Sequence, residues 1–96
     1  MSAYVIADVD VHDPEAYAEY RQGVQATLDA YGGRFVVRGG DFGVVEGGWD
    51  WHRVVVLEFP DVATARRWHD SEEYAPLLRK RQAAASSRLL IVEAYG

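Results

Sequence analysis

Cysteine is absent from the sequence, and lysine occurs only once, at Lys80. Without cysteine the chain forms no disulfide, offers no thiolate ligand to zinc and has no cysteine nucleophile. The scarcity of lysine bears on Asp41, Phe42 and Gly43, which spell part of a protein-kinase signature. No strand lysine, glycine-rich nucleotide loop or catalytic loop accompanies this tripeptide, so we exclude a kinase.

Positive charge is also in short supply. The sequence has ten Lys and Arg against fifteen Asp and Glu, and the formal net charge of -5 disfavours nucleic acid or an anionic membrane as partner. No apolar run approaches the roughly 20 residues that span a bilayer. Residues 1–10 alternate and include Asp8 and Asp10, unlike the basic start and unbroken apolar stretch of a signal peptide. We therefore expect a soluble, cytoplasmic protein.

The histidines are few and scattered. His12, His52 and His69 do not stand at the two-, three- or four-residue spacings of a local metal motif. The glycines match neither the dinucleotide-binding fingerprint nor the phosphate loop. With no thiolate, no histidine pair and no nucleotide loop, we expect no metal, haem or flavin as cofactor.

Apolar residues, by contrast, are plentiful. Hydrophobic residues make up 49% of the chain and aromatic residues 12%. A chain of 96 residues buries about 65% of its unfolded surface, which is enough for one core. We therefore expect residues 1–96 to form a single ordered domain.

The hydrophobic pattern predicts the order of helices and strands. Alternation with a period of two indicates strands, and apolar residues at steps of three and four indicate helices. The predicted strands are Ala3–Val11, a second one in two pieces (Arg34–Arg38 and Phe42–Glu46), His52–Phe59 and Ser87–Tyr95. The predicted helices are Pro14–Tyr31 and a region after Pro60 that forms either two short helices or one helix bent at Pro76. This order is typical of an α+β, ferredoxin-like βαββαβ sandwich, with a four-stranded antiparallel sheet and two helices on one face.

The later strands are apolar on both faces. Val55 and Leu57 alternate with Val54 and Val56, and the last strand repeats the pattern. An antiparallel sheet with helices on one side normally has a polar opposite face. Because a monomer rarely leaves a large apolar patch in water, we expect a homodimer that packs sheet against sheet.

Several local strings resemble a known family when they are taken together. They are Tyr31-Gly32-Gly33-Arg34-Phe35, Arg38-Gly39-Gly40, Glu46-Gly47, the strand Val55–Phe59, Trp68–Tyr74 with Ser71 between, and Arg81. As a set they resemble the family called domain of unknown function thirteen-thirty, within the dimeric α/β-barrel superfamily. The resemblance implies a ferredoxin-like subunit and a homodimer whose two sheets form a barrel, and it implies no established activity. The chain departs from the family in its end, Glu93–Gly96, and in the aromatic loop Trp49–Trp51.

One constellation of side chains is a candidate ligand site. In a ferredoxin-like unit the space between helices and sheet can open into a cleft, where polar aromatic residues orient a ligand. The candidates are Tyr17 and Tyr20 in the first helix, Arg38 in the second strand, Trp68, His69 and Tyr74 in the second helical region, and Arg81. We predict a small anionic or phenolic ligand that meets Arg38, His69 and Tyr74.

Structural roles for the same residues remain open alternatives. The tyrosines can fill the core with their hydroxyls reaching solvent, and Arg38 can pair with Glu46 or Glu58 across the sheet. His69 stands three and four residues before Glu72 and Glu73, a spacing that also suits a structural histidine.

Two functions of different class follow from the candidate site. The first is a binding dimer without turnover. The second is a cofactor-independent enzyme, a small monooxygenase or isomerase acting on an organic acid or aromatic. In the second, Arg38 and Arg81 would hold a carboxylate or enolate and His69 or Tyr74 would carry a proton.

Overall fold

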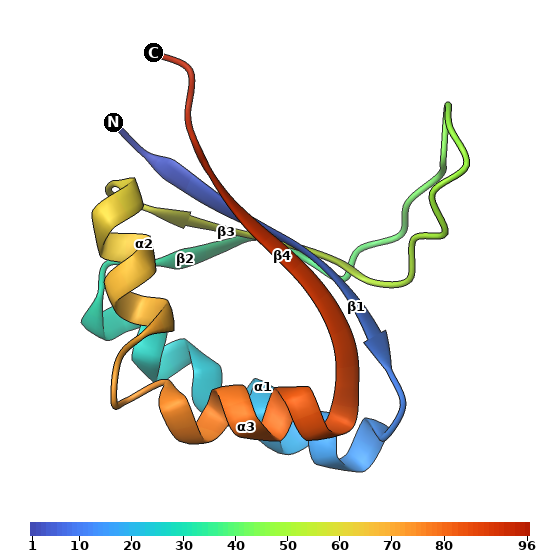
Figure 1. Ribbon diagram of the computed structural model, residues 1–96, viewed down its shortest axis with the longest axis horizontal. Helices are drawn as coiled ribbons and strands as arrows, with labels where there is room; N and C mark the ends of the chain where they lie inside the picture. The colour runs from blue at the N-terminus through green and yellow to red at the C-terminus, as the bar shows by residue number, and fades with distance from the viewer.

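A four-stranded antiparallel sheet and three helices make up the fold, in a computed structural model that describes all 96 residues. In chain order the elements are β1 (Ala3–Val11), α1 (Pro14–Ala30), β2 (Arg34–Arg38), β3 (Val54–Phe59), α2 (Val62–His69), α3 (Ala75–Ala84) and β4 (Ala85–Glu93). The strand order is β2-β3-β1-β4, and α1 and α3 lie together below the sheet (Figure 1). The predicted α+β, ferredoxin-like order is confirmed.

The first helix begins and ends where the sequence predicts, to within one residue. Asp13 caps it by accepting a hydrogen bond from the Ala16 N–H at 3.2 Å, and Pro14 takes the first position, where no N–H partner is needed. At the other end Gly32 has a φ of 70°, a conformation that glycine adopts without steric cost. The helix therefore ends at Ala30, one residue before the predicted Tyr31.

The second helical region is two helices, so the alternative of a single bent helix is wrong. The Ser71 hydroxyl donates to the Trp68 carbonyl at 2.8 Å and accepts from the Tyr74 N–H at 3.1 Å, which closes the turn between α2 and α3. Pro76 lies in the first turn of α3, where its missing N–H costs nothing. With α1 the fold thus has three helices, as the alternative of two short helices after Pro60 allows, rather than the two of the basic βαββαβ pattern.

The predicted strand piece Phe42–Glu46 is wrong. The chain turns at Gly39, whose φ is 69°, and does not rejoin the sheet until Val54. Residues 40–50 are all exposed and pair with no strand. We call residues 39–53 the arm. It projects from the body on the side away from α1 and α3 (Figure 1).

The bounds of the third and fourth strands also differ from the prediction. Strand β3 begins at Val54 rather than His52, and β4 runs from Ala85 to Glu93 rather than from Ser87 to Tyr95. No residue separates α3 from β4, because the helix ends at Ala84. The Ala84 carbonyl accepts the backbone N–H groups of His12 and Asp13, which fixes this junction to the start of α1.

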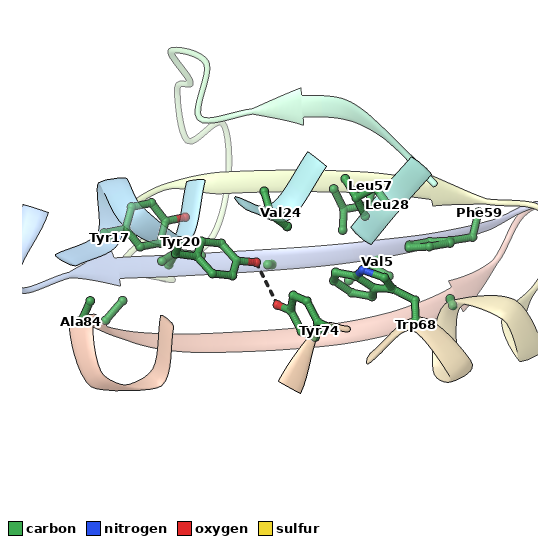
Figure 2. Packing of buried hydrophobic residues seen from close by; sticks show 14 residues of the cluster. Val5, Tyr17, Tyr20, Val24, Leu28, Leu57, Phe59, Trp68, Tyr74 and Ala84 are labelled. Carbon is green, nitrogen blue, oxygen red and sulfur yellow. Dashed lines mark hydrogen bonds between the residues drawn. The ribbon is translucent and has the colours of Figure 1, made fainter. Parts of the chain in front are cut away.

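The core lies between the helices and one face of the sheet (Figure 2). The largest side chains with no more than 2% exposure are Trp68, Tyr74, Phe59, Leu28 and Val24. Alternate residues of β1, from Ala3 to Val9, point into this core. The apolar residues of the predicted first helix that recur at steps of three and four are buried, apart from the half-buried Tyr31; they are Tyr17, Tyr20, Val24 and Leu28.

The opposite face of the sheet, which we call the outer face, is apolar at its centre. Val37, Val56, Ile6 and Leu90 form one row across the four strands, because each is paired with the next. Leu90 is 51% exposed, and Val92 beside it is 42% exposed. No helix covers these residues, so the predicted second apolar face is present. Among the helices, none has the length and apolar character to cross a membrane.

Candidate functional site

A pocket lies between the sheet and the helices, at the point where the candidate residues meet. Its floor includes the row Arg38, Val55, Ala7 and Leu89, which are paired across the four strands. Its walls come from the helical side and include Tyr17, Tyr20, Val24, Trp68, Tyr74 and Arg81. Six of the seven predicted site residues therefore line one pocket, and His69 is the exception.

A chain of hydrogen bonds crosses the pocket wall. The hydroxyls of Tyr20 and Tyr74 are 2.8 Å apart (Figure 2), and Arg81 Nε donates to the Tyr74 hydroxyl at 3.4 Å. Burial, with Tyr74 alongside, raises the pKa of Tyr20 far above its usual value, so the phenol stays protonated. These hydrogen-bonded side chains therefore present two hydroxyls, of which that of Tyr20 is protonated, and one guanidinium to the pocket.

The pocket is positively charged. Its lining contains Arg21, Arg38, Arg53 and Arg81 but no aspartate or glutamate. The arginines that form ion pairs are Arg34 and Arg88, outside the pocket. Arg81 is only 5% exposed, and a buried charge without a counterion is costly. The electrostatics therefore favour an anion.

Arg38 reaches the pocket side of the sheet through an irregularity in β2. Phe35 pairs with Leu57 but Val37 pairs with Val56, so a bulge lies between them and Arg38 comes opposite Val55. The Arg38 guanidinium lies 4.2 Å from the centre of the Phe35 ring and donates to the Arg21 carbonyl at 3.2 Å.

The alternative in which Arg38 forms an ion pair with Glu46 or Glu58 is wrong. Glu58 belongs to the outer face, where its Oε1 accepts from Arg34 Nε at 2.8 Å. Glu46 lies in the arm and forms no ion pair with Arg38. Arg38 is exposed and carries no carboxylate partner, so its charge remains available at the pocket.

Arg53 was not among the predicted site residues, although it also lines the pocket. Its Nε is buried with no hydrogen-bond partner, and its guanidinium carbon lies 5.7 Å from the centre of the Tyr17 ring. A side chain at Gly39 would collide with this guanidinium, so the glycine leaves the space that Arg53 occupies. The sequence signal was its alternation with Val55 and Leu57, which places all three on one face.

His69 lies in a groove that adjoins the pocket rather than in the pocket itself. The groove is lined by Arg66, His69, Leu90 and Ile91, and it shares Val5, Trp68 and Leu89 with the pocket. Helix α2 ends at His69, so the predicted helical spacing to Glu72 and Glu73 is not realised. Instead, His69 Nδ1 is 3.5 Å from Asp70 Oδ1.

The two hollows differ in size. The free volume of the pocket is about 30 Å³, which is room for a water molecule. That of the adjoining groove is about 310 Å³, near the lower limit of small-molecule sites. An organic ligand therefore fits only if it uses the groove or moves side chains that close the pocket.

A second polar cluster, at the base of the arm, is separate from the pocket. Asp8 is 4% exposed, and its Oδ1 accepts the backbone N–H groups of His52 at 2.8 Å and Arg53 at 3.2 Å. His52 Nδ1 lies 3.2 Å from Asp8 Oδ2, and its Nε2 is 3.7 Å from Asp10 and 3.6 Å from Asp50. These contacts attach the returning end of the arm to β1.

The cluster shifts the pKa of both partners. Burial tends to raise the pKa of Asp8, but the hydrogen bonds from His52 and Arg53 outweigh it and hold that pKa below its usual value. The hydrogen bond to Asp8, with help from Asp10 and Asp50, raises the pKa of His52 against the opposing effect of burial. Neither this cluster nor any other group of three or more His, Asp or Glu side chains is arranged to hold a metal ion.

Replacing His52 by glutamine should lower the melting temperature most at mildly acidic pH. Because folding raises the pKa of His52, its stabilisation is complete below the unfolded value of about 6.5 and is lost as pH rises through the folded pKa. Because folding lowers the pKa of Asp8, its contribution is present above about 3.9 and is lost as pH falls through the folded pKa. The difference between wild type and variant should therefore be largest between about pH 4 and 6.5, measured by thermal melts.

His12→Gln is the matched control, because the His12 ring contacts the Ser86 hydroxyl rather than a carboxylate. Its melting curve should follow that of the wild type across the pH range. Parallel curves for wild type and His52→Gln would show that the Asp8–His52 contact contributes no pH-dependent stability.

Comparison with known proteins identifies relatives of the chain. The model of a family described as "Domain of unknown function (DUF1330)" matches residues 2–95. Among curated proteins, none matches the chain.

Several solved structures share the fold. The RPA0582 protein of unknown function from Rhodopseudomonas palustris has a TM-score of 0.81 at 23% identity, covering 99% of this chain and 83% of that one. A dimeric ferredoxin-like protein of unknown function from Thermobifida fusca has a TM-score of 0.65 at 17% identity, covering 98% and 92%. SnoaB, a cofactor-independent oxygenase from Streptomyces nogalater, has a TM-score of 0.59 at 17% identity, covering 99% and 94%. At these identities the likeness shows the ferredoxin-like fold and nothing finer.

Proposed function

Because the chain belongs to the DUF1330 family, whose description states no function, we propose one from the geometry of its own pocket. We propose that the protein is a homodimeric binding domain for a small organic anion that carries an aromatic ring. The observation that carries this proposal is Arg81, which is 5% exposed, lines the pocket and has no carboxylate partner. A ligand carboxylate or phenolate would supply the missing counterion.

The ring of the ligand is inferred from the apolar surfaces around Arg81. Trp68 and Leu89 face both the pocket and the groove, so a planar ring can lie against them while its anionic group reaches Arg81. His69 lines the same groove and would contact the exposed end of the ligand. Exposed Arg38 can move aside or close over the pocket, since no ion pair holds it.

Binding without turnover is the function that the geometry supports best. Tyr20 is held in its protonated form, and the pocket lining offers no carboxylate or histidine as a general base. The alternative is a cofactor-independent monooxygenase or isomerase, for which the Arg81–Tyr74–Tyr20 chain would carry a proton. The oxygenase SnoaB shares the fold, which is support by analogy only.

Replacing Arg81 by methionine should weaken the binding of benzoate and 4-hydroxybenzoate by roughly 10- to 100-fold. The change keeps an apolar stem but removes a charge-assisted hydrogen bond worth about 1.5–3 kcal/mol. Stability should stay equal or rise, because the variant no longer buries a charge without a counterion. Calorimetric titration and a thermal melt on the same samples measure both effects.

Arg79→Met is the control, because Arg79 is an exposed arginine on the same helix and lies outside the pocket. It should bind both acids as the wild type does. Benzyl alcohol, which has the ring but no charge, should bind more weakly than benzoate. Equal binding of benzoate and benzyl alcohol by the wild type, or unchanged binding by Arg81→Met, would refute an anion site at Arg81.

The dimer is proposed from the outer face. Leu90 is 51% exposed and Val92 is 42% exposed, at the edge of an apolar row that no helix covers. A monomer rarely keeps such a patch in water, and a second copy can cover it with the same patch about a two-fold axis. The dimeric Thermobifida fusca protein has this fold, in keeping with the proposal.

A further inference from the structure

The arm places large apolar side chains in water. Val45 is 98% exposed, Val44 51% and Phe42 47%, and all three lie within four residues of one another. None of them packs in the core. Exposed apolar side chains concentrated on a projecting segment are typical of an interaction surface.

The arm is held at its base, so its position relative to the sheet is defined. The Gly39 N–H donates to the Val54 carbonyl at 2.9 Å, where the arm leaves and rejoins the sheet. At the returning end, Asp8 accepts the backbone N–H groups of His52 and Arg53. The arm therefore leaves β2 and returns to β3 at two fixed points.

The arm also rests on the polar end of the outer face. The Trp49 and Trp51 rings are stacked, with centroids 4.3 Å apart and planes 15° apart. The Arg88 guanidinium lies 4.5 Å from the centre of the Trp49 ring. Arg88 is paired with Asp8 across β4 and β1, on the same face as the pair Ile6 and Leu90 and in the next row of that face. The base of the arm and the apolar part of the outer face are therefore contiguous.

Charge decides which kind of partner suits the arm. The arm includes three carboxylates, those of Asp41, Glu46 and Asp50, and a single arginine, Arg53, which lies at its base and lines the pocket. An acidic arm repels nucleic acid and anionic membranes. The arm rises on the side of the sheet away from the helices (Figure 1), so a copy of this chain seated on the outer face would meet it.

We propose that the arm of each protomer packs against the other protomer, with Phe42, Val44 and Val45 as its contacts. This inference rests on the proposed homodimer and adds to it a second contact region outside the sheet. Because a two-fold dimer repeats every contact, both arms take part, and each arm residue contributes twice to the dimer.

The lack of cysteine makes the arm straightforward to test. A spin label on Val45→Cys should be mobile in dilute monomer and become immobilised as the dimer forms. A label on Glu72→Cys, at an exposed position in the turn before α3, is the matched control and should stay mobile throughout. Because the label replaces an exposed side chain, the labelled protein should stay folded throughout this measurement.

The dimer constant supplies the second measurement. The triple variant Phe42→Ser, Val44→Ser and Val45→Ser should raise the dissociation constant at least 10-fold in sedimentation equilibrium. Tyr95→Ser, a fully exposed aromatic at the other end of the chain, should leave it unchanged. If the wild type is a dimer and the triple variant has the same dissociation constant, the arm contact is overturned and the sheet dimer stands. The same conclusion follows if the spin label at position 45 stays mobile in the dimer. A wild type that stays monomeric overturns the proposed dimer itself.

Discussion

Replacing Val56 by aspartate should convert the proposed dimer to a monomer at micromolar concentration. Val56 stands in the central row of the outer face, between Val37 and Ile6. In a sheet-to-sheet dimer this position is covered by the partner, so the new carboxylate would lose its water without gaining a cation. Burying such a charge costs several kcal/mol even after relaxation, which corresponds to a weakening of at least about 100-fold.

Sedimentation equilibrium and light scattering measure this change directly. Ala18→Asp is the control, because Ala18 is exposed on α1 and the charge change is the same. It should leave the dimer constant unaltered. If Val56→Asp stays dimeric, the outer face is not the interface, and the exposed Leu90 and Val92 need another cover.

Replacing Trp68 by alanine should lower the free energy of unfolding by about 3–5 kcal/mol. Trp68 is 1% exposed and packs between Phe59 and Tyr74, with ring centroids 5.3 Å and 4.1 Å away. Its indole N–H donates to the Thr27 hydroxyl at 3.0 Å. Since small domains are stable by about 5–15 kcal/mol, this loss removes between about a fifth and all of the free energy of unfolding.

Urea unfolding compares this variant with Trp49→Ala, the same change on the arm. Trp49 is 45% exposed and stacks on Trp51 outside the core, so its removal should cost about 1 kcal/mol or less. Similar losses in the two variants would mean that the packing around Trp68 does not stabilise the domain. Trp68→Phe should fall between the two, because it keeps a ring and loses the hydrogen bond to Thr27.

Local signals made most of the fold predictable. Asp13 and Pro14 mark the start of α1, and the steps of three and four from Tyr17 to Leu28 define its buried face. These signals act within one element, so the sequence shows them without knowledge of the partner strands. The two apolar faces of the later strands could likewise be predicted from the alternation of side chains alone.

The arm shows where local signals fail. Phe42, Val44 and Val45 suit a strand, yet a strand forms only where a neighbour offers a backbone to pair with. Strand β2 pairs with β3 over Arg34–Arg38, and the turn at Gly39 carries the next residues away from the sheet. This outcome depends on contacts between distant segments, which composition and periodicity do not record.

The candidate site was predictable in its aromatic part and less so in its charges. Simple alternation puts Arg38 on the same face as Arg34, which pairs with Glu58. The bulge between Phe35 and Val37 moves Arg38 to the helix side instead. A one-residue irregularity thus decides whether Arg38 is a structural ion pair or part of the pocket, and the sequence gives no sign of where such a bulge falls.

Because α3 leads directly into β4, the direction in which the side chains of the helix point is fixed relative to that of the side chains of the strand. Arg81 faces the pocket from α3, while Leu89 faces it from β4 and Leu90 faces away. One residue inserted between Ala84 and Ala85 would either turn α3 by about 100° or exchange Leu89 and Leu90 between the faces. The same insertion in the arm would alter neither. The spacing from Arg81 to Leu90 therefore sets the pocket and the outer face together, and the chain tolerates changes of length in the arm but not at this junction.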